Sequence, residues 1–304
     1  MFDQLFDGAL LESVFRALIP ILLAAIGGMV CERAGVFQIS LEGMMLVGAF
    51  AAVAGSYLGQ SALLGSTMAM VITGLFSLIL GYGAVTRRGD PIVLGVATNL
   101  LALGLTSFLL PQLFGVRGVF QHPRVDGLDQ LAIPFLSDLP LVGQALFNLT
   151  IPGYLALLAI PLIWLFLFRT PIGLRLRGVG ERPASAETLG VSPTQYKYAA
   201  VVFSGLVCGL AGAQLALGNV VQFAENMSSG RGWIAVVAVM LGRAHPAGVL
   251  GASALFGFAE GLGFRLQGNG LPVQITEALP YVVTLIALAL ARKRFQRILE
   301  LTAA

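Results

Sequence analysis

Long apolar runs without a charged residue alternate with short polar stretches along this chain. These runs cover 43–86, 91–116, 139–168 and 198–224. A helix needs roughly 20 residues to cross the hydrocarbon core of a bilayer, so the first run can hold two helices. The runs are too long, and alternate too weakly, for strands of an outer-membrane barrel. The pattern therefore predicts membrane-spanning α-helices.

Glycine, proline and charged residues divide these runs into individual helices. The candidate spans are 15–31, 39–57, 62–85, 92–114, 152–168, 198–219, 232–242, 247–264 and 278–291. Segment 232–242 is too short to cross alone, so it is either half of a broken helix or a re-entrant piece. The expected fold is all-α, a polytopic membrane protein with eight to ten transmembrane or half-membrane helices in one domain, 1–304.

Composition supports a membrane protein. Of 304 residues, 57% are hydrophobic and 11% are charged, whereas an ordinary soluble domain carries about a quarter charged residues. The first seven residues lack the features of a signal peptide, so no cleavage is expected. Cys31 and Cys208 lie in apolar surroundings and are expected to behave as small hydrophobes. The net charge of +3 comes from clusters between spans, so no nucleic-acid partner is expected.

Basic residues between the spans set the expected orientation. They gather in loop 169–197, at Arg87 and Arg88, and in the tail 292–297, which should all face the cytoplasm. Loop 115–151 then falls on the other side as the main extracytoplasmic loop. Counting crossings puts the N-terminus outside as well, unless an early helix is re-entrant or split, and the sequence leaves that side open.

Glu32, Arg33 and Glu42 place ionisable side chains between two apolar runs. Charge at membrane depth is costly and indicates either function or mutual pairing. An ion pair between Arg33 and Glu42 would pin the turn at the cytoplasmic interface. Alternatively, Glu42 lies on the substrate pathway and acts in gating.

Two other polar groups are candidates for the substrate pathway. Asn99 and Thr106 lie two turns apart on one face of an apolar helix, with Ser107 beside them, although such residues also hydrogen-bond between helices. Asn226 and Trp233 flank the start of the short helix, where free N–H groups attract polar oxygens. The alternative there is a Glu225–Arg231 pair with Trp233 as an aromatic-belt residue.

Loop 169–197 is the longest polar insertion on the cytoplasmic side. Residues 184–189, after Pro183, read as a short helix that Gly190 closes. Such a helix can dock a soluble partner, although a basic loop that obeys the positive-inside rule is the alternative. The candidate coupling residues are Arg175, Arg177, Glu181, Pro183, Ala186, Leu189 and Gly190. Separately, Gly205, Gly209 and Gly212 form small-residue faces that predict close helix packing.

Segments 32–44, 99–108, 173–190, 204–212 and 230–236, in this order, resemble the ribose-permease-like family of ABC importer permeases, with nucleoside permeases the most similar branch. The Ala184-Ser185-Ala186 and Gly190 pattern resembles the family's Glu-Ala-Ala then Gly loop, with Ala184 in place of Glu. The resemblance implies two permease subunits that form the pathway, cytoplasmic ATPase subunits and an extracytoplasmic substrate-binding protein or lipoprotein. It also implies a heterodimer with a longer permease.

The resulting expectation is a non-catalytic permease subunit of an ATP-driven nucleoside importer in the bacterial cytoplasmic membrane, in contact with membrane lipid. ATP would bind the partner ATPase, so no cofactor or metal is expected in this chain. A simple-sugar permease is the near alternative, because an uncharged hydrophilic cargo of either kind suits a pathway of Asn, Ser and Thr. A proton-coupled secondary transporter using Glu32 or Glu42 is a more distant one. No ion-filter repeat, Ser-His-Asp set or metal-spaced cluster is visible.

Overall fold

The computed structural model describes residues 8–132 and 146–268, together with 274, 276, 278–283 and 285. Within this part, seven helices are long and apolar enough to cross a membrane. Their bounds are α1 Gly8–Arg33, α2 Leu41–Gly59, α3 Ala62–Gly81, α4 Pro91–Phe114, α6 Ile151–Arg169, α9 Pro193–Ala213 and α11 Pro246–Gly268. Two of them continue in π-helical turns, α3 into η1 Tyr82–Thr86 and α9 into η2 Gln214–Val220. The predicted all-α polytopic fold is confirmed.

Three shorter helices lie between these spans. α10 Arg231–Leu241 is the predicted half-length helix. The predicted helix after Pro183 is α8 Pro183–Thr188, and Gly190 follows it with a φ of +77°. α7 Pro171–Glu181 was not predicted. Its first turn is capped by Thr170, whose hydroxyl accepts a hydrogen bond from the Gly173 N–H at 3.1 Å.

Short strands organise the loop after α4. β1 Val119–Phe120 pairs antiparallel with β4 Phe223–Ala224, and β2 Gln130–Ala132 pairs antiparallel with β3 Asn148–Thr150. Asp126 ties the same loop to the start of α3, because its carboxylate accepts from the Ala62 N–H at 3.3 Å. The loop is therefore attached to the bundle, a feature that the sequence did not indicate.

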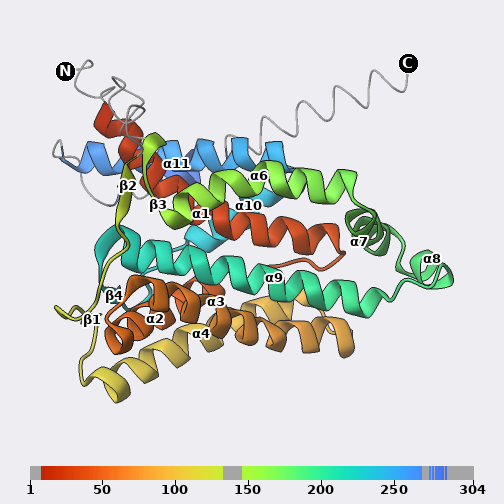
Figure 1. The fold of residues 1–304 in the computed structure, drawn as a ribbon, viewed down its shortest axis with the longest axis horizontal. Coiled ribbons are helices and arrows are strands. Elements are labelled where there is room, and N and C mark those ends of the chain that lie inside the picture. The colour runs from red at the N-terminus through yellow and green to blue at the C-terminus, as the bar shows by residue number, and fades with distance from the viewer. Residues whose placement is uncertain are drawn as a thin grey trace.

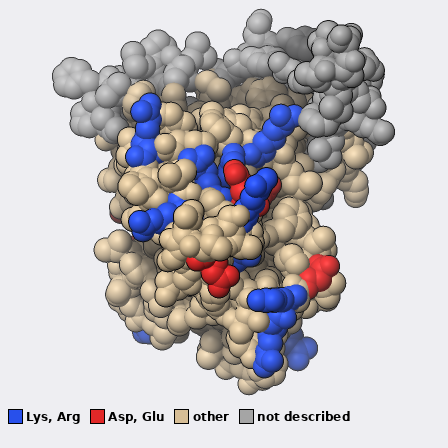
Figure 2. Space-filling model, turned by 90° about the vertical axis from the view of Figure 1, so that its right-hand side faces the viewer, with Lys and Arg blue, Asp and Glu red and all other residues tan. Residues whose placement is uncertain are grey.

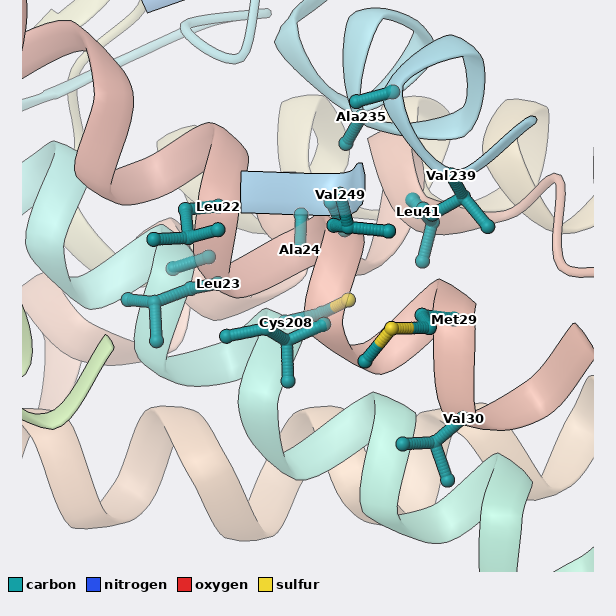
Figure 3. Close-up of a cluster of buried hydrophobic side chains, with 14 of the residues drawn as sticks. Leu22, Leu23, Ala24, Met29, Val30, Leu41, Cys208, Ala235, Val239 and Val249 are labelled. Carbon is teal, nitrogen blue, oxygen red and sulfur yellow. The ribbon is translucent and has the colours of Figure 1, made fainter. Parts of the chain in front are cut away.

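Helix α1 lies at the centre of the bundle and packs against α2, α9, α10 and α11 (Figure 1). In its most apolar window 89% of the residues are buried, compared with 22% in α4. Figure 3 shows Leu22, Leu23 and Met29 of α1 together with Val239 of α10 in the core. Cys31 and Cys208 are buried and free, which agrees with their predicted role as small hydrophobes.

The glycines of α9 pack against two neighbouring helices, as predicted. A Cβ on Gly205 would lie 2.7 Å from the Ser77 side chain on α3, and one on Gly212 would overlap the backbone of α2 at Met45. Gly209 meets α3 at Ala69 in the same way. The small residues therefore let the backbones approach closely.

Helices α7 and α8 lie at one end of the bundle, and the four short strands lie at the other (Figure 1). The first turns of α1 belong to the strand end, because the Arg16 carbonyl accepts from Asn219, which follows α9 on that side. The structure thus places the start of α1 on the side of loop 115–151. Half of the predicted span 278–291 and the whole basic tail 292–297 lie outside the described residues.

Candidate functional site: a half-length helix held at both ends

The segment 34–40 between α1 and α2 is not helical, although apolar residues flank it on both sides. It begins after Arg33, the last residue of α1, and ends just before Glu42 in the first turn of α2. Gly35 has a φ of +77°, a conformation that glycine adopts without strain. The two charged residues therefore stand at opposite ends of a non-helical connection.

The carboxylate of Glu42 caps the first turn of α10. Its Oε1 accepts from the Gly230 N–H at 2.8 Å, and its Oε2 accepts from the Gly232 N–H at 2.7 Å. A Cβ on Gly232 would overlap the backbone of Glu42, so glycine is required for this close approach. Both oxygens of the carboxylate are thus used at the start of α10.

Arg33 holds the other end of α10. Its Nε donates to the Ala244 carbonyl at 2.6 Å, and its Nη2 donates to the Arg243 carbonyl at 3.2 Å. Residues 243 and 244 form the turn between α10 and α11, and both have a positive φ. Arg33 also lies 5.9 Å from the centre of the Phe168 ring on α6.

The charges of Glu42 and Arg33 are opposite in sign to the partial charges at the two ends of α10. The N-terminus of a helix carries partial positive charge and its C-terminus partial negative charge, so an anion at the first and a cation at the second are both stabilising. The predicted Arg33–Glu42 ion pair is wrong, because each side chain instead binds backbone groups at a different end of α10. The two charges thus position α10 between α1 and α2.

Asn99 of α4 fastens the same non-helical connection from the other side. Its Oδ1 accepts from the Gly43 N–H at 2.8 Å, and its Nδ2 donates to the Ile39 carbonyl at 3.1 Å. The Thr106 hydroxyl donates to the Ala102 carbonyl of its own helix at 2.9 Å, and Ser107 is half-buried. The amide of Asn99 therefore bridges two helices, which is the alternative that the sequence had left open.

The outer end of α10 carries an ion pair other than the predicted one. Arg231 pairs with Glu260 of α11, with Nη2 and Oε1 2.6 Å apart, and Glu225 accepts from the Gly118 N–H at 2.9 Å. The predicted Glu225–Arg231 pair is therefore wrong. Asn226 is exposed with a φ of +56°, and Trp233 is 41% exposed. Sequence reasoning missed Glu260 as the partner, because 29 residues separate it from Arg231.

Helices α7 and α8 form a groove with the start of α9 at the opposite end of the bundle. The groove encloses about 670 Å³. Of the predicted coupling residues, it is lined by Arg175, Glu181, Ala186, Leu189 and Gly190. The Leu189 side chain is 83% exposed, whereas Ala186 is buried. Figure 2 looks onto this end and shows Lys and Arg side chains spread over it, a distribution that is typical of cytoplasmic faces.

A direct contact joins this end to α1. A Cβ on Gly180 of α7 would overlap the Arg33 carbonyl, and one on Gly35 would lie 3.0 Å from the Gly180 Cα. Arg177 stacks 4.7 Å from the centre of the same Phe168 ring that Arg33 faces, and its Nε donates to the Leu167 carbonyl at 2.9 Å. Helix α7 ends at Glu181 and α8 begins at Pro183, so only Arg182 separates the two helices. Helix α7 thus connects the groove to Arg33, which binds the turn after α10.

These features define a polytopic α-helical membrane protein in which the half-length helix α10 is held at both ends, and α7 and α8 form a groove at one end of the bundle. The chain belongs to the family described as the permease component of the branched-chain amino acid transport system, which it matches over residues 10–288. It is therefore a multi-pass membrane permease, and in bacteria permeases of this family lie in the inner membrane.

Named relatives cover most of the chain. The guanosine ABC transporter permease NupQ of Bacillus subtilis is 39% identical, over 88% of this chain and 87% of NupQ. The putative glucose ABC transporter permease TsgC13 of Haloferax volcanii is 35% identical, over 94% of this chain and 92% of TsgC13. A second guanosine permease of Bacillus subtilis, NupP, is 24% identical, over 91% of this chain and 79% of NupP.

A solved structure shares the fold. PsaBC from Streptococcus pneumoniae, in complex with Fab, superposes with a TM-score of 0.50 at 17% identity and covers 94% of this chain and 95% of its own. At that identity the similarity concerns the fold alone.

Proposed function

We propose that this chain is the membrane-spanning subunit of an ATP-driven importer of nucleosides. The observation that carries the proposal is 39% identity, along nearly the whole chain, to a permease named for guanosine transport. The all-helical fold with a docking groove at one end supports the same assignment. In this role the chain performs no chemistry, and ATP hydrolysis belongs to a cytoplasmic ATPase subunit.

The proposed assembly has three further kinds of subunit. A second, longer permease completes the pathway, which the pair NupQ and NupP in one organism supports, because this chain spans only 79% of NupP. An ATPase subunit docks in the groove of α7 and α8. A substrate-binding protein or lipoprotein delivers the cargo at the strand end.

The contacts suggest how ATPase movement reaches the pathway. A displacement of α8 moves α7, which touches the Arg33 carbonyl at the end of α1 through Gly180. Arg177 of α7 and Arg33 of α1 also face the same Phe168 ring on α6. Arg33 at that end holds the turn after α10. Movement of the docking groove therefore pulls on the cytoplasmic end of α10, while Glu42 holds its other end.

The geometry divides the six proposed pathway residues into two groups. Glu42 and Asn99 use their polar atoms on backbone groups, and the Thr106 hydroxyl is bound to its own helix, so we assign these three to shaping the pathway. Ser107, Asn226 and Trp233 are at least partly exposed and are the proposed contacts with cargo. Trp233 offers an aromatic surface on which a nucleobase can stack.

A simple sugar is the second candidate cargo, because TsgC13 is named as a putative glucose permease. Uptake of radiolabelled guanosine and uridine in cells that express the chain with its partner subunits separates the two. We expect an excess of unlabelled nucleoside to suppress uptake, and an equal excess of ribose or glucose to leave it unchanged. Cells without this chain are the control. Uptake of labelled ribose or glucose, with no uptake of nucleosides, would contradict the nucleoside assignment.

A further inference from the structure

A deep apolar groove separates α6 from α9 on the outside of the bundle. It encloses about 590 Å³. Its floor is the central helix α1 at Leu23, Ile26 and Val30, and its walls include Leu158 of α6 and Phe203 of α9. The floor residues are almost completely buried, so the groove reaches the core of the bundle.

The lining is apolar except for the phenol of Tyr196 at one end. Water in such a groove would find almost no hydrogen-bond partners, and an apolar occupant is favoured instead. The groove lies between two membrane spans, where the surrounding solvent is hydrocarbon. A lipid acyl chain is therefore an occupant that the environment itself supplies.

The length of the groove fits one leaflet. Its lining runs along α9 from Tyr196 to Leu210 and along α6 from Leu155 to Phe166. At 1.5 Å per residue these stretches measure about 21 and 17 Å. One leaflet contributes about half of the 30 Å hydrocarbon core. Ile172 and Leu176 of α7 line the cytoplasmic end of the groove.

Basic side chains follow the groove lining at that cytoplasmic end. Arg169 comes three residues after Phe166, Arg175 directly precedes Leu176, and Lys197 directly follows Tyr196. Arg169 stacks 5.6 Å from the Trp164 ring, an aromatic–basic pair typical of the membrane interface. Arg169 of α6 and Lys197 of α9 thus follow lining residues on the two walls of the groove, whereas Arg175 lines the groove of α7 and α8.

We propose that this groove binds an anionic phospholipid of the cytoplasmic leaflet. One acyl chain fills the space between α6 and α9, and the phosphate group lies near Arg169 and Lys197. Basic pockets between helices on the cytoplasmic side suit anionic headgroups of this kind. The lipid packs against α7, the helix that joins the docking groove to the end of α1.

Native mass spectrometry of the complete complex, released from nanodiscs of equal parts phosphatidylglycerol and phosphatidylcholine, tests this proposal. We expect retained phosphatidylglycerol on the wild type. Ala199→Phe adds a ring to the exposed part of the groove wall and should reduce the retained lipid about tenfold. Val71→Phe adds a ring to the exposed face of α3 and should leave it unchanged.

The headgroup is tested with the double variant Arg169→Gln and Lys197→Gln, which should lose the preference for phosphatidylglycerol over phosphatidylcholine by about tenfold. Elution of each complex at the wild-type volume on size exclusion shows that it has assembled. Equal lipid retention in Ala199→Phe and Val71→Phe would overturn the proposal, and so would equal retention of the two lipids by the wild type. Loss of the second permease in Ala199→Phe alone would show that a protein helix occupies the groove instead.

Discussion

Glu42→Ala should reduce cargo uptake at least tenfold while the subunit still inserts in the membrane. The substitution removes both acceptors at the start of α10, the hydrogen bonds to Gly230 and Gly232. Hydrogen bonds to a charged group contribute about 1.5 to 3 kcal/mol each, and a tenfold change corresponds to about 1.4 kcal/mol. Without these two hydrogen bonds, the start of α10 is no longer fixed to α2.

Two variants control this experiment. Glu42→Gln keeps the shape and one carbonyl acceptor but loses the charge, so its uptake should fall between wild type and Glu42→Ala. Glu225→Ala removes an exposed carboxylate near the same helix and should leave uptake close to wild type. Protease protection or membrane fractionation confirms insertion in each case. Wild-type uptake by Glu42→Ala would show that the capping of α10 has no part in transport.

Leu189→Asp should separate the permease from its ATPase subunit. Leu189 is 83% exposed in the groove of α7 and α8, so the substitution places a charge on a docking surface without disturbing the core. A few residues near the centre of an interface contribute about 2 kcal/mol or more to binding, and burying an unpaired carboxylate there adds a further cost. Uptake should fall more than tenfold.

Co-purification of the ATPase with tagged permease measures the loss directly. Leu189→Met preserves the apolar surface and should retain both the ATPase and uptake. Glu187→Gln changes an exposed charge on the same short helix and serves as the matched control. If Leu189→Asp retains the ATPase as well as wild type does, then α8 is not the docking element.

The sequence predicted the membrane-spanning helices because local information determines them, whereas the amphipathic α7 was not predicted. Apolar runs of suitable length predicted the seven long helices, and the charge and glycine at the two ends of 231–241 predicted a half-length one. Pro183 and Gly190 similarly bounded α8. The glycine face of α9 predicted close packing for the same reason, since spacing on a helix is a local property.

The partners of the charged residues could not be predicted in this way. Arg33 and Glu42 are close in sequence, and pairing them was the simplest interpretation, yet each binds a segment about 190 to 210 residues away. Arg231 likewise pairs with Glu260 on another helix. Gly180 and Gly232 gave no signal of function, because their importance lies in the backbone that approaches them. Such contacts depend on which helices become neighbours.

Transport in proteoliposomes that contain the purified permease pair, ATPase and substrate-binding protein tests whether this chain serves an ATP-driven nucleoside importer. Radiolabelled guanosine and its binding protein are placed on the extracytoplasmic side, and ATP is supplied only to the ATPase side. We expect accumulation that requires ATP, stops when the Walker lysine of the ATPase is replaced, and proceeds without a proton gradient. Accumulation driven by an imposed proton gradient in the absence of ATP would contradict it.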